Sequence, residues 1–174
     1  DCFQTMKLFG SKVAFLPLGG SGKDWQQEGC AAYQQMVSRL RTAGEMAKQE
    51  GITIGIRTGM GAKFDKKLLK KVGSSQIKVY YNFQDAADHH RDICKELRKL
   101  GAQRIVQIHA SNTDSVNLQE DPEINLPKIR KTLDKMKWSG WLVVERSRDV
   151  KRVRDVKYNF GRNIAYLKQV FQER

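Results

Sequence analysis

Short apolar runs alternate along this chain with longer stretches in which apolar residues return every three or four positions. The short runs predict buried β-strands, and the longer stretches predict amphipathic helices. The predicted strands are residues 13–18, 52–56, 77–81, 104–109 and 141–145. The predicted helices are residues 26–50, 65–72, 85–100, 127–136 and 159–172. Glycines at positions 51, 73 and 101 follow three of these helices as stop signals.

A strand–helix unit repeated about five times predicts an α/β fold in which parallel strands are joined by right-handed crossovers. The 174 residues fit a single domain, 1–174, of TIM-barrel-like design. A complete eight-stranded α/β barrel needs about 250 residues, so the chain is too short for one. Two architectures stay open at this point: a partial TIM barrel of about five units, or an open flavodoxin-like sheet.

The chain is strongly basic, with 32 Lys and Arg against 19 Asp and Glu and a formal net charge of +13. This charge indicates either an anionic partner or a solvated basic surface. The densest basic cluster, residues 146–157, is interleaved with Asp149 and Asp155. Nucleic-acid-binding arms usually lack such interleaved acids, so nucleic acid is not the expected partner.

The cysteines and the apolar runs indicate the cellular compartment in which we expect the protein. The three cysteines are far apart and form no CxxC pair, which argues against a cysteine metal site and favours a reducing environment. No apolar run is long enough to span a bilayer, and no signal peptide is visible. We therefore expect a cytoplasmic protein without membrane contact. The chain begins with Asp1 rather than Met, as a processed chain or a fragment would.

Polar residues stand at the ends of four predicted strands: Arg57, Asn82, His109 and Glu145. In parallel α/β folds, chemistry collects at the carboxyl ends of the strands. Four such residues in register predict a shared polar cavity. Each has a plain structural alternative, because His109 could be a core histidine, Asn82 a turn or cap residue, Glu145 the partner of a nearby arginine, and Arg57 a surface residue.

Three further features lie outside these strand ends. Arg146 and Arg148 follow the fifth strand, where a barrel often holds a phosphate, and arginine forks suit phosphate; a solvated helix face is the alternative. The glycine-rich residues 19–23 lack the spacing of a P-loop and are interpreted as a flexible loop. The adjacent His89 and His90 are expected on the surface of a helix.

Four segments carry a resemblance to a known family: residues 51–58, 77–82, 105–109 and 140–145. In order and spacing they resemble the last four strands of sugar phosphate isomerases/epimerases, within the xylose-isomerase-like TIM barrel superfamily. Residues 13–18 match the strand before these. The resemblance implies the C-terminal five strand–helix units of a barrel, without the first three.

The resemblance also implies a divalent metal, Mn, Mg or Zn, held by a Glu, an Asp, a His and a Glu at successive strand ends. The two acids would move a proton between adjacent sugar carbons. His109 and Glu145 match the last two ligands, as metal and catalytic residues, whereas Arg57 and Asn82 replace the first two. Arginine cannot ligate a metal. We therefore expect a degenerate metal site in which Arg57 pairs with Glu145.

These features predict a sugar or sugar-phosphate isomerase/epimerase-like protein. The alternative is a non-catalytic module that binds a sugar phosphate or another anion through Arg57, Asn82, Arg146 and Arg148. An endonuclease IV-like enzyme is disfavoured, because its zinc cluster needs more histidines than the three present. A homo-oligomer that completes the barrel is also expected, since open sheet edges need cover.

Overall fold

The computed structural model describes residues 2–19, 23–111 and 114–173. Its five parallel strands form one sheet, and they lie in the order β1-β2-β3-β4-β5, which is also their order along the chain. The strands are β1 (Val13–Pro17), β2 (Thr53–Arg57), β3 (Ile77–Asn82), β4 (Ile105–His109) and β5 (Trp141–Val143). A flavodoxin-like sheet would reverse its strand order at a switch point. The sequential order therefore confirms the partial TIM barrel.

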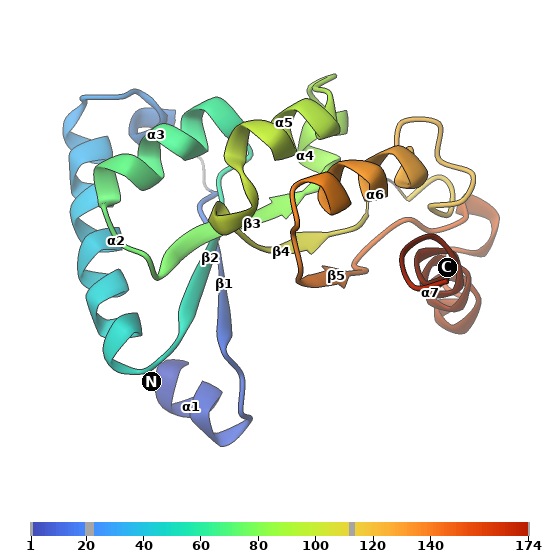
Figure 1. Ribbon diagram of the computed structural model, residues 1–174, viewed down its shortest axis with the longest axis horizontal. Helices are drawn as coiled ribbons and strands as arrows, with labels where there is room; N and C mark the ends of the chain where they lie inside the picture. The colour runs from blue at the N-terminus through green and yellow to red at the C-terminus, as the bar shows by residue number, and fades with distance from the viewer. Residues whose placement is uncertain (1, 20–22, 112–113, 174) are drawn as a thin grey trace.

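The helices cover one side of this curved sheet. They are α1 (Cys2–Leu8), α2 (Ala31–Gln49), α3 (Ala62–Val72), α4 (Phe83–Ala87), α5 (Ile93–Leu100), α6 (Leu126–Lys135) and α7 (Val156–Phe171). Short 3-10 turns are η1 (Lys23–Gln26), η2 (Ala102–Arg104) and η3 (Val150–Arg152). Figure 1 shows α2, α3, α5 and α6 arching around the outside of the strands, while the opposite side stays open. No described helix has both the length and the apolar character needed to cross a membrane.

The hydrophobic core lies between the convex face of the sheet and the helices. Ile56, Leu68, Leu97 and Ile108 are completely buried there, and they come from two strands and two helices. Burying such side chains is the dominant favourable contribution to folding. Gly73 ends α3 in the left-handed conformation (φ 72°) and donates its N–H to Leu69. The predicted glycine stop is therefore correct at this position, where a side chain would be strained.

The prediction of one helix over residues 85–100 is wrong. The chain forms α4 and then α5, because Asp92 begins a new helix by accepting a hydrogen bond from the Lys95 N–H (2.9 Å). His90 has a left-handed backbone (φ 51°), so His89 and His90 lie in the turn between the helices. Both are exposed, as expected, but they are not on a helix.

Several predicted boundaries also change. The helix predicted from residue 26 begins at Ala31, where the Cys30 side chain accepts from the Tyr33 N–H. The helices predicted from residues 65 and 159 begin three residues earlier, and the last strand ends at Val143 rather than at 145. The helix α1 was not predicted. Residues 20–22 of the predicted glycine-rich loop lie outside the described residues.

The concave face of the sheet carries aromatic side chains that approach the strand ends. The ring of Phe15 in β1 lies 4.8 Å from that of Tyr80 in β3, and Tyr80 lies 4.4 Å from His109 in β4. Gly55 in β2 makes room for this packing. A Cβ at that position would lie 2.9 Å from Val106 Cγ1 and 3.0 Å from Tyr80 Cδ2. The rings of Phe15 and Tyr80 therefore pack side by side on the concave face, and both contact the His109 ring.

We expect Gly55→Ala to destabilise the protein by about 1–3 kcal/mol, because the added methyl group has no room between Tyr80 and Val106. Gly161→Ala on the exposed side of α7 is the control, since nothing lies within 4 Å of its added Cβ. This control should stabilise the helix by up to about 1 kcal/mol. Urea unfolding followed by circular dichroism measures both changes. Equal stability of the Gly55 variant and the wild type would contradict the tight packing.

Candidate functional site

The four predicted strand-end residues gather at one edge of the sheet. Arg57, Asn82 and His109 are the last residues of β2, β3 and β4, and Glu145 follows β5 by two positions. Asn82 and His109 are direct register partners, and both are buried. The parallel sheet thus brings together residues that are up to 88 positions apart in the chain, from Arg57 to Glu145.

His109 is held between two polar side chains. Its Nδ1 lies 3.3 Å from Glu145 Oε2 and 3.5 Å from Asn82 Nδ2. Burial lowers the pKa of His109, the negative charge of Glu145 opposes this shift, and the positive charge of Arg57 adds to it. The imidazole is therefore neutral at pH 7. Its Nδ1 can donate to the Glu145 carboxylate when it carries the proton, or accept from the Asn82 amide when Nε2 carries it.

Asn82 has a structural role beside this pair. Its Oδ1 accepts a hydrogen bond from the Gln84 N–H (2.8 Å), which caps the first turn of α4. Asparagine is a favoured cap residue because its side-chain oxygen satisfies a free N–H at the helix start. The cap alternative from the sequence is therefore correct, and the same side chain also contacts His109.

Arg57 pairs with Asp85, so the prediction that it pairs with Glu145 is wrong. Its Nε and Nη2 donate to the two oxygens of the Asp85 carboxylate at 2.9 and 2.6 Å. The reason is local: α4 begins immediately after β3, and its first turn brings Asp85 to the end of β2. The hydrogen bonds that Arg57 donates to Asp85 raise the pKa of Arg57, while burial opposes the shift. Such a two-fold contact is strong and geometrically specific.

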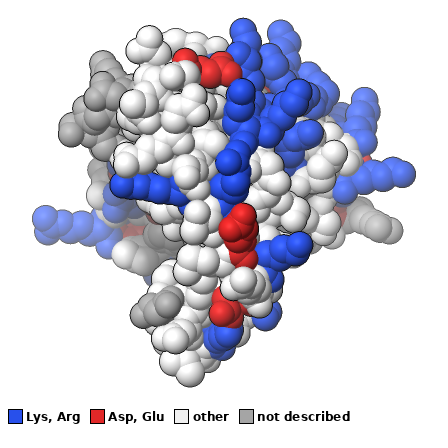
Figure 2. Space-filling view, turned by 90° about the vertical axis from the view of Figure 1, so that its left-hand side faces the viewer, with Lys and Arg blue, Asp and Glu red and all other residues white. Residues whose placement is uncertain are grey.

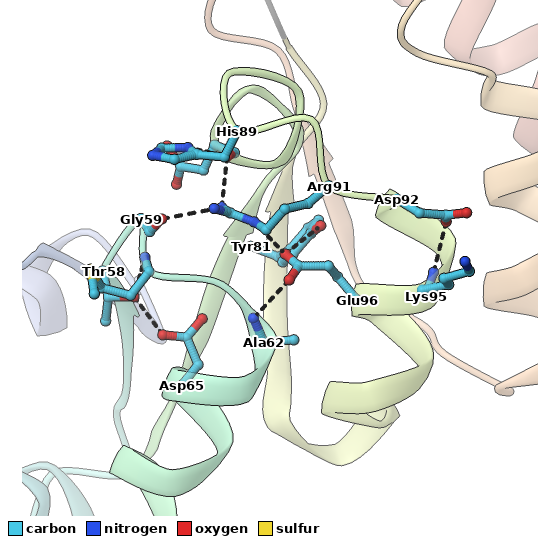
Figure 3. Close-up of polar contacts among 12 residues, drawn as sticks. Thr58, Gly59, Ala62, Asp65, Tyr81, His89, Arg91, Asp92, Lys95 and Glu96 are labelled. Atoms are coloured by element: carbon cyan, nitrogen blue, oxygen red, sulfur yellow. Dashed lines mark hydrogen bonds and ion pairs between the residues drawn. The ribbon is translucent and has the colours of Figure 1, made fainter. Parts of the chain in front are cut away.

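A second network surrounds Arg91, and Figure 3 shows Arg91 reaching Gly59 and Glu96 reaching Ala62. Arg91 Nη2 donates to the Asp85 carbonyl at 2.6 Å and to the Gly59 carbonyl at 3.1 Å. Arg91 Nε also lies 3.4 Å from Glu96 Oε2, and Glu96 Oε1 accepts from the Ala62 N–H at 3.0 Å. These contacts join the turn after β2 to the turn between α4 and α5. They therefore hold the Arg57–Asp85 pair in place.

Asp65 is a buried acid under the same turn. It is 5% exposed, and the Thr58 hydroxyl donates to its Oδ1 at 2.5 Å. Burial raises the pKa of Asp65 to about 7, against the lowering effect of the Thr58 hydrogen bond. The sequence analysis missed Asp65, Asp85, Arg91 and Glu96. For Asp85 a signal exists, since an arginine in place of an acid needs a counter-charge and Asp85 is the next acid after Asn82.

Arg146 and Arg148 both contact one carboxylate in the loop that follows β4. Arg148 donates to Asp114 through Nε and Nη2, each at 2.8 Å, and Arg146 donates through Nε at 3.0 Å. Hydrogen bonds from the two arginines hold the pKa of Asp114 well below its usual range. Between them, the buried Ser147 accepts at its carbonyl oxygen from Asn163 Nδ2 (2.6 Å). The role of Arg146 and Arg148 as phosphate ligands remains a prediction.

The residues at the strand ends do not fit the implied four-ligand divalent metal site. Within the described part of the chain, no group of three or more His, Cys, Asp and Glu could hold a metal ion. His109 and Glu145 are two donors, and the Asn82 oxygen is engaged in capping α4. Arg57 adds a positive charge that lowers the pKa of His109 and would also repel a cation.

The comparisons with known proteins agree with the partial TIM-barrel fold. Residues 1–170 match the family described as Xylose isomerase-like TIM barrel, and the chain belongs to this family. No curated protein sequence gives a significant match.

Solved structures with a similar fold include sugar epimerases. D-psicose 3-epimerase in the presence of D-fructose has a TM-score of 0.78 at 12% identity, over 98% of this chain and 68% of its own. L-ribulose 3-epimerase has a TM-score of 0.78 at 14% identity, over 98% and 64%. The IOLI protein with a bound zinc atom has a TM-score of 0.72 at 14% identity, over 99% and 68%. The chain thus spans about two thirds of these proteins, 64–68% of their length.

We expect Asp65→Asn to be more stable than the wild type at about pH 8. The unfolded carboxyl group has a pKa near 3.9 and the folded one about 7, so the wild type loses stability as the pH rises from about 4 to about 7. The amide in the variant does not titrate, so the advantage of the variant should shrink as the pH falls towards 4. Urea unfolding across this range measures it. Exposed Asp134→Asn is the control, and an equal pH dependence in both variants would contradict the buried-acid interpretation.

Proposed function

We propose that the strand ends bind a sugar or sugar phosphate and that Glu145 moves a proton between its adjacent carbons without a divalent metal. The family and the similar sugar epimerases support the sugar isomerase/epimerase class. The observation that carries the proposal is the contact of Glu145 with a buried neutral His109, beside the Arg57 guanidinium.

Glu145 has the exposure that a catalytic base needs. Its side chain is 48% exposed, while that of His109 is 8% exposed. The carboxylate is therefore open to solvent and substrate while it contacts a buried histidine. A proton on His109 Nδ1 orients the carboxylate, whose Oε2 lies 3.3 Å away. Glu145 then takes a proton from the carbon next to a sugar carbonyl and returns it, on the same face, to the former carbonyl carbon. Epimerisation would need a second proton donor, such as water, on the opposite face. His109 is a positioning residue in this scheme.

Arg57 supplies the positive charge that such a reaction requires. When the proton leaves carbon, the bond's electron pair moves to the carbonyl oxygen and gives an enediolate. Asp85 engages Nε and Nη2 of Arg57, which leaves Nη1 outside this pair. An oriented guanidinium next to the forming oxyanion stabilises it. In isomerisation, a hydroxyl proton also moves between the two sugar oxygens.

Solvent deuterium exchange into a panel of ketoses and their phosphates tests this function. In D2O with chelator, NMR should show deuterium at the carbon next to the carbonyl. Glu145→Gln should reduce this exchange by about 100-fold or more, in keeping with the usual contribution of a general base. Exposed Glu45→Gln is the matched control and should leave the rate unchanged. Arg57→Met should also slow exchange, while Arg39→Met on the exposed face of α2 should not.

Two results would contradict the proposal. Exchange that appears only after Mn, Mg or Zn is added would show that the chemistry needs a metal. Sugar phosphate binding without any exchange would favour the second candidate, a non-catalytic anion-binding module. The observation that favours this candidate is the pair Arg146 and Arg148, which already binds the carboxylate of Asp114.

The open sheet also supports a proposal about assembly. The strands β1 and β5 form the edges of the described sheet, and Trp141 in β5 is 74% exposed. A second copy that covers these edges would bury this ring. Light scattering during gel filtration should then give a dimer mass for the wild type and a lower mass for Trp141→Ser. Leu8→Ser in α1, where Leu8 is 86% exposed, is the control. A monomeric wild type would contradict self-association.

A further inference from the structure

A basic groove lies at the amino ends of the strands, away from His109 and Glu145. It has a volume of about 480 Å³, within the range of small-molecule sites. Four cationic side chains line it: Lys66 and Lys70 of α3, Lys78 of β3, and Arg104 of η2. Lys78 is the second residue of β3, and Arg104 directly precedes β4. The groove is therefore at the opposite end of the sheet from the candidate site.

The groove carries positive charge without a compensating acid. No Asp or Glu among the described residues lines it. Lys66 and Lys70 form no ion pair within residues 2–19, 23–111 and 114–173, whereas Lys67 of the same helix pairs with Glu28 at 2.9 Å. Figure 2 shows Lys and Arg crowded over one edge of the face that α2 and α3 present, with few acids among them. The charges in the groove are thus available to a ligand.

One of the four cations, Arg104, is held in position by a hydrogen bond to the protein backbone. Arg104 Nη1 donates to the Leu100 carbonyl at 2.9 Å, which fixes the guanidinium at the end of α5. Its Nε and Nη2 form no hydrogen bond within the described residues. Arginine binds phosphate oxygens through such adjacent N–H groups. A fixed guanidinium loses less conformational entropy when a ligand binds.

The carbonyl end of α3, which would repel an anion, is already covered. Arg41 from α2 donates to the Lys71 carbonyl at 2.8 Å and to the Val72 carbonyl at 3.2 Å. Gly73 donates to the Leu69 carbonyl at 3.0 Å. These contacts neutralise the negative end of the helix dipole near the groove. The lysines of α3 therefore dominate the local potential.

We propose that this groove binds a small molecule that carries two or more phosphate groups. Four cations in one concave site match several phosphates, since one phosphate group carries only about two charges at pH 7. Ser75 and Gln103 line the same groove and supply neutral donors to the remaining oxygens. The compact shape of the groove favours a small ligand over an extended polymer.

Calorimetric titration with inorganic tripolyphosphate tests the groove directly. The wild type should bind, and the double variant Lys66→Ala/Lys70→Ala should bind at least about tenfold more weakly, because two charged contacts are lost. The control is Lys131→Ala/Lys135→Ala on α6, which removes two charges from a separate groove. This control should change the affinity by less than about twofold, since screened charges outside the groove contribute little. Glu145→Gln should leave tripolyphosphate binding unchanged, which separates this site from the proposed function.

Three results would overturn the proposal. No binding of tripolyphosphate at low salt would exclude the site. Equal weakening in both double variants would show that net charge alone attracts the anion. A single-stranded oligonucleotide that binds more tightly than tripolyphosphate, with an affinity that falls steeply with added salt, would instead indicate a nucleic-acid surface.

Discussion

The ion pair between Arg57 and Asp85 is the interaction on which the candidate site depends. It places a positive charge at the end of β2 and neutralises that charge with an acid from the first turn of α4. A half-buried guanidinium without such a partner would lose part of its hydration without compensation. Because Asp85 satisfies Arg57, the carboxylate of Glu145 is left to contact His109. The partner of one arginine thus decides which groups are available for chemistry.

The surrounding structure holds this pair by its backbone. Arg91 binds the carbonyl oxygens of Asp85 and Gly59, and Glu96 fixes the start of α3 through the Ala62 N–H. These groups are connected through buried or half-buried hydrogen bonds, which restrict the movement of both turns. The acid Asp65 lies in the same region, where burial raises its pKa to about 7. This network therefore holds the Arg57–Asp85 pair in a fixed position at the strand ends.

The two ends of the sheet have different electrostatic character. At the carboxyl ends, opposite charges are paired: the half-buried Arg57 with Asp85, and the more exposed Arg146 and Arg148 with Asp114. At the amino ends, the four cations of the groove face solvent without acids among the described lining residues. Paired charges suit a ligand with little charge, such as a sugar or a sugar with one phosphate group, whereas unpaired cations suit a ligand with several phosphate groups. The excess of basic residues behind the net charge of +13 therefore matters more for the proposed groove, where the cations are unpaired, than for the strand-end site, where they are paired.

The sequence by itself determined the strands, most of the helices and the polar strand ends. Apolar runs mark buried strands, and a glycine such as Gly73 marks a helix end, because both signals depend on residues that are close in the chain. Tertiary structure decided the partners: Asp85 for Arg57, Asp114 for Arg146 and Arg148, and the meeting of α3, β3 and η2 around the basic groove. It also decided the break between α4 and α5, where the Asp92 cap and the left-handed His90 interrupt a helical pattern. Ionic partners depend on distances between elements in space, and the pattern of residue types along a chain does not contain those distances.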